Sequence, residues 1–173
     1  MQSDFTDFYV MTGKFDDAIE FESKLKRVLE RGNCTIQLRQ KCDDREYLEL
    51  VHIAEPLCTQ HNTTLLLATS AELFKQLSAD GLHLNSKVLK DFNKRPVADD
   101  KLLSVSCHTL EDMQHADRLG ADILLLSPVK ETSSHPGEPG LGWDTFKEMS
   151  TQFKQPVYAL GGMKASDLDD AKA

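Results

Sequence analysis

The sequence predicts an α/β fold of the (β/α)8 TIM-barrel class that is truncated before its eighth strand. Seven short apolar runs alternate along the chain with stretches of helical periodicity, an order that favours a parallel sheet with right-handed crossovers. Five of these runs end in a polar or glycine-rich segment, and a barrel of this class collects its functional groups at the C-terminal ends of its strands. We therefore expect residues 1–173 to form a single barrel domain that lacks the strand needed to close it.

The first half of the chain contains four of the predicted strands, separated by helices. Either Asp16 or Asp17 can cap the first helix, which is expected to stop at Gly32. The second helical pattern starts near Asp44 and carries Pro56 late in its length, which predicts a kink or a boundary there. The strands are expected at residues 8–11, 35–38, 64–67 and 82–84.

The second half contains three predicted strands and the longest aperiodic segment. Thr109 can cap a helix that stops at Gly120. Residues 127–142 include three prolines and three glycines, which predicts a loop, and loops of this length in compact domains are often functional. The strands are expected at residues 102–105, 123–126 and 157–160, with helices at 143–153 and from 165 onward.

Bulk properties exclude several classes of function. The formal net charge of −8 and the lack of a clustered basic face argue against nucleic-acid binding. No apolar stretch approaches the ~20 residues of a membrane span, and the N-terminus lacks the features of a signal peptide. The four cysteines show neither a C-x-x-C pair nor zinc-type spacing. These features together predict a cytoplasmic protein.

The end of the second strand carries a group of polar and basic residues. Arg39 and Lys41 alternate with Gln40, so both are expected to share a face with Gln37. A planar guanidinium beside an ammonium suits a diphosphate, which can accept bidentate hydrogen bonds from Arg39. The alternative interpretation is a pair of solvated charges at a strand end.

Two later segments are candidates for binding a phosphate. Gly161 and Gly162 follow a strand and precede a helix, where close backbone approach and unpaired amides favour an anion. The loops after the seventh and eighth strands are the usual phosphate site of a β/α barrel. Thr132, Ser134 and His135 add hydroxyls and an imidazole in the long loop. The alternative for the two glycines is a plain tight turn, and the alternative for the long loop is a solvent-exposed polar segment.

The sequence does not predict a metal site. Thr69 follows the third strand and Val88 follows the fourth, and neither position offers the carboxylate oxygens that a divalent ion prefers. Cys107 and His108 could be interpreted as a nucleophile and a base. Neighbouring residues on a strand point to opposite faces, however, so this thiol mechanism is disfavoured.

An ordered set of motifs covers nearly the whole chain. In chain order they are Gln37-Leu38-Arg39-Gln40-Lys41, Asp80-Gly81-Leu82-His83-Leu84, Ser104-Val105-Ser106-Cys107-His108-Thr109, Gly120-Ala121-Asp122, Ser127-Pro128-Val129, Gly140-Leu141-Gly142-Trp143 and Ala159-Leu160-Gly161-Gly162-Met163. In this order and spacing the chain resembles the thiamine phosphate synthase and TenI superfamily. It also looks like the C-terminal barrel domain of fusion proteins that begin with a MutT-type Nudix hydrolase.

The resemblance implies a barrel that joins hydroxymethylpyrimidine diphosphate to a thiazole phosphate and releases diphosphate. It implies that Gln37 contacts the pyrimidine, that Arg39 and Lys41 hold the diphosphate, and that His135 stands where the family has a catalytic lysine. The hydroxyls of Ser106, Thr132 and Ser134 would meet ligand oxygens, and Gly161 with Gly162 would hold the thiazole phosphate. These assignments make Arg39, Lys41 and His135 the expected catalytic residues.

The chain departs from the family pattern where magnesium is expected. Thr69 and Val88 replace the aspartates that the resemblance implies as Mg²⁺ ligands, and Pro128 stands near the position of the histidine of the tautomerase branch. Two hypotheses therefore remain open: a thiamine phosphate synthase, or a degenerate barrel that binds a thiamine-related phosphate in a regulatory or accessory role. An unrelated phosphate-binding barrel is a third. The expected partners are small phosphorylated pyrimidines and thiazoles, a second copy of the chain or a fused Nudix domain.

Overall fold

The computed structural model describes residues 6–132, 137 and 139–172. Seven strands in this part of the chain form one sheet, in which the strand order follows the sequence from β1 to β7. All the recorded strand pairs are parallel. This topology confirms the predicted alternation of parallel strands and helices. The chain divides into two compact units, Met1–His83 and Leu84–Ala173, which are described in turn.

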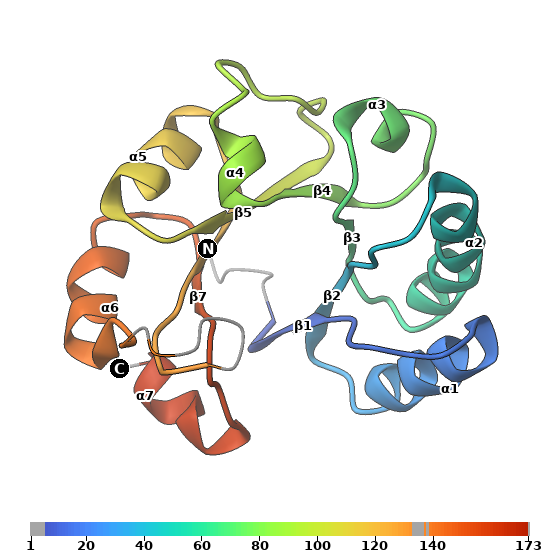
Figure 1. Ribbon diagram of the computed structural model, residues 1–173, viewed down its shortest axis with the longest axis horizontal. Helices are drawn as coiled ribbons and strands as arrows, with labels where there is room; N and C mark the ends of the chain where they lie inside the picture. Colours follow the sequence, from blue (N-terminus) through green and yellow to red (C-terminus); the bar gives the residue numbers. More distant parts are fainter. Residues whose placement is uncertain (1–5, 133–136, 138, 173) are drawn as a thin grey trace. The chain divides into compact units, whose positions relative to one another are not determined.

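The first unit contains β1 to β3, most of β4, and three helices. Helices α1 and α2 lie side by side on the outer face of the strands (Figure 1). The elements are β1 (Phe8–Met11), α1 (Ala18–Leu29), β2 (Cys34–Leu38), α2 (Asp44–Gln60), β3 (Leu65–Leu67), α3 (Ala71–Phe74) and β4 (Gly81–Leu84). The three leucines of β3 are at most 2% exposed, so this strand has apolar neighbours on both faces.

Short polar side chains fix where the helices of the first unit begin. Asp17 accepts a hydrogen bond from the backbone N–H of Glu20 at 2.8 Å, and Asp43 accepts one from Glu46 at 2.9 Å. These are N-cap contacts that satisfy otherwise unpaired amides. Of the kink or boundary predicted at Pro56, the boundary is wrong, because helix α2 continues to Gln60. Buried Ala54 and Cys58 flank the proline and pack into the core, which offsets the lost backbone hydrogen bond.

The second unit has β5 (Leu102–Cys107), β6 (Ile123–Leu126) and β7 (Val157–Ala159) at its centre. Its other elements are α4 (Ser86–Leu89), α5 (Leu110–Arg118), α6 (Gly142–Ser150), the 3₁₀ turn η1 (Ala165–Asp167) and α7 (Leu168–Lys172) (Figure 1). The predicted cap is confirmed, because the Thr109 hydroxyl accepts a hydrogen bond from the N–H of Asp112 at 3.1 Å. No helix in the described ranges is both long and apolar enough to cross a membrane.

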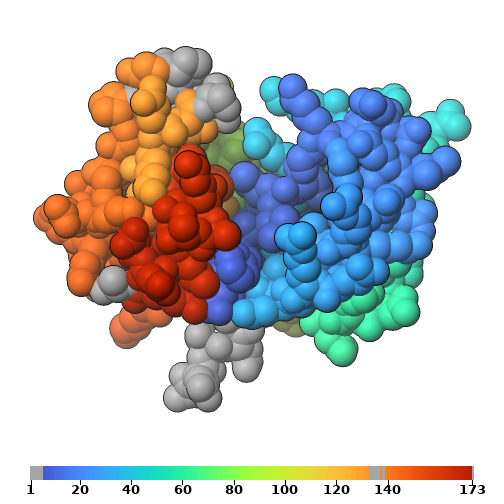
Figure 2. Space-filling view, turned by 90° about the horizontal axis from the view of Figure 1, so that it is seen from below, coloured from blue at the N-terminus to red at the C-terminus, as the bar shows by residue number. Residues whose placement is uncertain are grey.

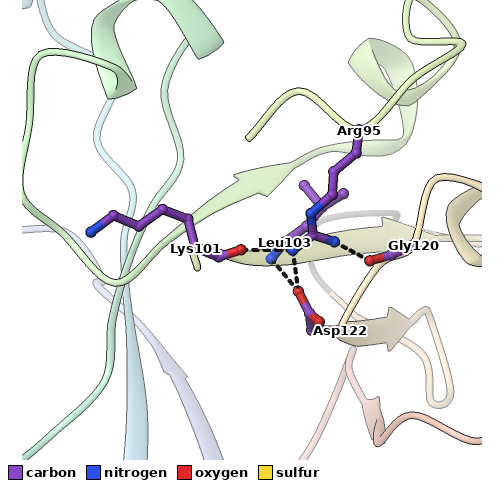
Figure 3. Close-up of polar contacts among 5 residues, drawn as sticks. All are labelled: Arg95, Lys101, Leu103, Gly120 and Asp122. Carbon is purple, nitrogen blue, oxygen red and sulfur yellow. Dashed lines mark hydrogen bonds and ion pairs between the residues drawn. The ribbon is translucent and has the colours of Figure 1, made fainter. Parts of the chain in front are cut away.

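A polar cluster ties together the N-terminal ends of β5 and β6 (Figure 3). The Arg95 guanidinium donates to Asp122 at 2.7 Å, to the Lys101 carbonyl at 2.6 Å and to the Gly120 carbonyl. The same Asp122 oxygen accepts the N–H of Leu103 at 2.8 Å. Arg95 thus links the segment before β5 to the residues that lead into β6. We call these five residues the Arg95 cluster.

Candidate functional site

Two groups of residues carry the features expected of a ligand site, one in each unit. In the first unit they lie at the end of β2 and in the loop after it, and in the second they follow β6 and β7. Both groups lie at C-terminal strand ends, where a β/α protein places its functional groups.

Gln37 is the buried polar residue of the first group. It is 1% exposed on β2, between Met11 of β1 and Leu66 of β3 in the strand register. Its side-chain carbonyl oxygen Oε1 makes no hydrogen bond to any described residue. An unpaired buried acceptor costs about 1–3 kcal/mol, so its presence in a folded core calls for a partner. A ligand with an N–H donor would supply one.

Arg39 and Lys41 lie in the loop after β2 rather than on the strand. The strand ends at Leu38, so alternation along a strand does not govern where these two side chains point. Both residues are exposed, and the structure records no counter-ion for either among the residues it describes. Thr12 holds the backbone here, because its hydroxyl donates to the carbonyl of Arg39 and accepts from its N–H, each at 2.9 Å. The two cations are therefore available to an anion in solution.

His83 adds a buried neutral imidazole to the first unit. It is 5% exposed, and its Nδ1 lies 3.3 Å from the hydroxyl of Tyr9. Burial is the main reason that the pKa of His83 falls to about 3, and the charge of Arg39 lowers it further. The imidazole is therefore uncharged near neutral pH.

In the second unit, the loop after β6 interlocks with the glycine turn after β7. The N–H of Val129 donates to Leu160 O at 2.8 Å, and the N–H of Lys130 donates to Gly161 O at 3.1 Å. A Cβ on Gly161 would lie 2.9 Å from Pro128, and one on Gly162 would lie 2.5 Å from a backbone oxygen of Glu131. The sequence indicated that these glycines serve a ligand. The structure shows that close packing of two loops also requires them.

The glycine turn still has donors to offer a ligand. Gly161 and Gly162 have φ angles of 93° and 67°, which favour glycine over other residues. Their backbone N–H groups make no recorded hydrogen bond to any residue in the described part of the chain. Two unpaired amides at a strand end suit a phosphate oxygen. The sequence-based assignment of these two residues is chemically consistent with this geometry.

An ion pair joins the same two loops. Lys130 Nζ lies 2.7 Å from Asp167 Oδ1, and the other carboxylate oxygen accepts the N–H of Lys164 at 2.8 Å. The Lys130 hydrogen bond is the main reason that the pKa of Asp167 lies below its usual value. Lys130 also stands 5.6 Å from the centroid of the Trp143 ring at the start of α6. Figure 2 shows the red C-terminal atoms of this unit against the orange atoms near residue 130.

The remaining predicted site residues are less informative. Ser106 lies on β5 and is partly exposed, and Thr132 lies in the loop after β6. Ser134 and His135 lie outside the described residues. A cavity of about 340 Å³ flanks α1 in the first unit, between residues such as Val10 and Val28, but none of the predicted site residues lines it.

The side chains near β3 and β4 do not fit a resident Mg²⁺. Thr69 offers only a hydroxyl after β3, and Val88 offers only hydrocarbon on α4. No group of three His, Cys, Asp or Glu residues that could hold a metal ion occurs within the described ranges. The four cysteines are free, and burial raises the pKa of Cys107 to about 12, which leaves it unreactive as a thiolate.

The strand topology defines a parallel β/α protein, in which cationic side chains and unpaired glycine amides lie near strand ends. Residues 8–173 match the family model described as Thiamine monophosphate synthase, TMP-TENI. The chain therefore belongs to that family, whose role is in thiamine biosynthesis.

Individual relatives agree with this assignment. The chain is 32% identical to the thiamine-phosphate synthase of Bacteroides thetaiotaomicron, over 91% of this chain and 79% of that protein. It is 28% identical to the thiamine-phosphate synthase of Clostridium tetani, over 86% of this chain and 74% of that one. The solved structure of a thiamine phosphate pyrophosphorylase from Pyrococcus furiosus superposes with a TM-score of 0.76, covering 95% of this chain and 79% of that chain at 21% identity. The last likeness confirms the predicted barrel fold class.

Proposed function

We propose that residues 1–173 act as one thiamine phosphate synthase domain, which joins hydroxymethylpyrimidine diphosphate to a thiazole phosphate. Residues at the end of β2 would bind the pyrimidine diphosphate, and the glycine turn after β7 would bind the thiazole phosphate. The observation that carries the proposal is the buried, unpaired Oε1 of Gln37, in the strand that leads to the free cations Arg39 and Lys41. An aminopyrimidine donates N–H to such an acceptor, while its diphosphate requires positive charge.

The proposed reaction is a substitution at the methylene carbon of the pyrimidine. The bond from this carbon to the diphosphate oxygen breaks, the electron pair leaves with the diphosphate, and the thiazole nitrogen forms the new C–N bond. Arg39 and Lys41 stabilise the charge that develops on the leaving group. Gln37 fixes the pyrimidine ring, and the amides of Gly161 and Gly162 bind the thiazole phosphate. The hydroxyls of Ser106, Thr132 and Ser134 donate to ligand oxygens. The imidazole of His135 assists the departure of the diphosphate.

Magnesium enters this proposal only as a property of the family. The donor chemistry of Thr69 and Val88 does not fit the ion, so no step is assigned to it here. Two protein cations then provide the neutralisation of the diphosphate. We propose that the activity of this chain depends more steeply on Arg39 and Lys41 than on added Mg²⁺.

The test is to incubate the protein with both phosphorylated precursors, with and without Mg²⁺, and to measure thiamine phosphate. Arg39→Ala is expected to lower kcat/KM about 100-fold, because a charge-assisted contact to the leaving group is lost. Gln37→Ala is expected to raise KM for the pyrimidine substrate, with Gln40→Ala as the matched control. The absence of product from wild-type protein with saturating precursors would contradict the proposal.

A second candidate is a binding domain without turnover. It is favoured by the side chains of Thr69 and Val88, a hydroxyl and a hydrocarbon, which stand where the family resemblance implies carboxylate ligands for magnesium. In this case the domain would bind a thiamine-related phosphate as an accessory of a cytoplasmic assembly, such as a second copy of itself or a fused Nudix hydrolase. Saturable binding of either precursor without product would favour this candidate over the synthase.

A further inference from the structure

The turn after β7 is enclosed by a ring of contacts that starts and ends at Lys130. The backbone N–H of Lys130 donates to Gly161 O, and its side chain reaches Asp167 six residues further along the chain. Asp167 in turn accepts the N–H of Lys164, which closes the ring at the far end of the turn. The backbone from Gly161 to Asp167 is therefore restrained at both ends by one residue of the opposite loop.

From this geometry we propose that Lys130 and Asp167 form a positioning pair that aligns the amides of Gly161 and Gly162 with the thiazole phosphate. This inference rests on the proposed function, because it deepens the role of the same turn. Lys130 and Asp167 act through the turn rather than by touching the substrate.

The environment of Asp167 explains why the pair positions the turn and does not itself bind the phosphate. Its side chain is 9% exposed, and each of its oxygens already accepts a hydrogen bond. A carboxylate satisfied in this way has little capacity left for a ligand, and its negative charge would repel a phosphate. The ammonium of Lys130 offsets that charge at 2.7 Å, so the turn presents its amides without a neighbouring uncompensated anion.

Two further contacts make this pair unlike an ordinary surface ion pair. The Lys130 ammonium also lies 5.6 Å from the ring centroid of Trp143, which holds it from the side of α6. Gly162 also packs against the side chain of Lys130, because a Cβ added to Gly162 would lie 2.9 Å from the Cβ of Lys130. The pair of Lys24 with Glu20 on α1 also contacts backbone groups, at Lys14 and Asp16, but its carboxylate side chain is 40% exposed, against 9% for Asp167, so solvent screens it more strongly. Lys130 is instead fixed by three segments of the chain.

Steady-state kinetics of Lys130→Met, Lys130→Arg and Asp167→Asn test the proposal. Lys130→Met keeps the aliphatic stem and is expected to raise KM for the thiazole phosphate about tenfold, with kcat changed less than about twofold. Lys130→Arg should recover most of the affinity. Asp167→Asn should match Lys130→Met, and the double variant should be no worse than either single one, because both remove the same contact. Lys147→Met, an exposed lysine on α6, is the charge-matched control.

An unchanged KM in Lys130→Met, or effects that simply multiply in the double variant, would overturn the proposal. Calorimetric titration with the thiazole phosphate separates this failure from failure of the proposed function. If wild-type protein makes no thiamine phosphate, a dissociation constant about tenfold weaker in Lys130→Met still supports the positioning pair. Equal dissociation constants, or no binding to wild-type protein, would contradict it whatever the activity.

Discussion

The second unit places two ion pairs at opposite ends of its strands. Arg95 and Asp122 lie where β5 and β6 begin, whereas Lys130 and Asp167 lie beyond the ends of β6 and β7. Each pair spans 2.7 Å, and in each the carboxylate also accepts a backbone N–H. The Arg95 cluster binds backbone groups that fix strand register, while Lys130 binds the turn that carries unpaired amides. The same chemistry therefore links two strand starts at one end, and in our proposal it positions a ligand-binding turn at the other.

The largest loss of stability is expected at the glycine turn after β7, where the neighbouring loop leaves no room for an added atom. Gly162→Ala places a Cβ 2.5 Å from a backbone oxygen of Glu131 at a φ of 67°. The strain of that φ and the clash together should reduce the free energy of unfolding by about 3 kcal/mol. Urea denaturation of the two proteins measures this difference, and Gly13→Ala, whose added Cβ meets nothing within 4 Å, is the control. Equal stabilities would show that the loops are not interlocked.

The next largest effect is expected from Asp122→Ala, which breaks the Arg95 cluster. It removes the carboxylate partner of Arg95, which keeps its two carbonyl acceptors, and leaves the N–H of Leu103 without its acceptor, so the free energy of unfolding should fall by about 2 kcal/mol. KM for both substrates should remain within about twofold of wild type, because no candidate ligand group contacts this end of the strands. A large change in KM with normal stability would invalidate the comparison.

The buried imidazole of His83 makes stability depend on pH. The pKa of His83 is lowered to about 3, against 6.5 in the unfolded chain. Because the unfolded chain takes up a proton at His83 before the folded chain does, stability is highest above pH 6.5. It falls as the pH drops from 6.5 toward 3. Between pH 7 and 5.5 the free energy of unfolding should fall by about 1 kcal/mol through this residue. Denaturation of His83→Gln should show a flatter pH dependence over this interval, and an identical slope would contradict a buried neutral imidazole.

The smallest effect is expected at the exposed pair Lys24 and Glu20 on α1. Both side chains remain at least 40% exposed, although their charged atoms lie 2.8 Å apart. Lys24→Met should leave the urea midpoint and both KM values within experimental error, because solvent screens such a pair. A drop comparable to that of Asp122→Ala would show that ion-pair distance, rather than surroundings, governs stability here.

Much of the fold could be predicted from the sequence. Periodicity placed all seven strands within a few residues, and the caps at Asp17 and Thr109 were visible as short polar residues before helical patterns. The glycines at 161 and 162 were candidates because few other residues tolerate such turns. Local patterns of this kind depend only on neighbours in the chain.

The two ion pairs could not be predicted in this way. Lys130 and Asp167 are separated by 37 residues, and Arg95 and Asp122 by 27, so only the folded chain brings them together. Strand alternation likewise failed to place Arg39, because β2 ends one residue before it. The unpaired oxygen of Gln37 emerges only when every neighbouring donor is known. Long-range contacts of this kind leave no periodic signal in a single sequence.

The most direct test of the comparison measures KM for the thiazole phosphate and the urea midpoint in Lys130→Met and Asp122→Ala side by side. Lys130→Met is predicted to raise KM about tenfold with only a small fall in the midpoint, and Asp122→Ala to lower the midpoint further while keeping KM. If KM and the midpoint changed together in both variants, the two ends of the strands would not have separate roles.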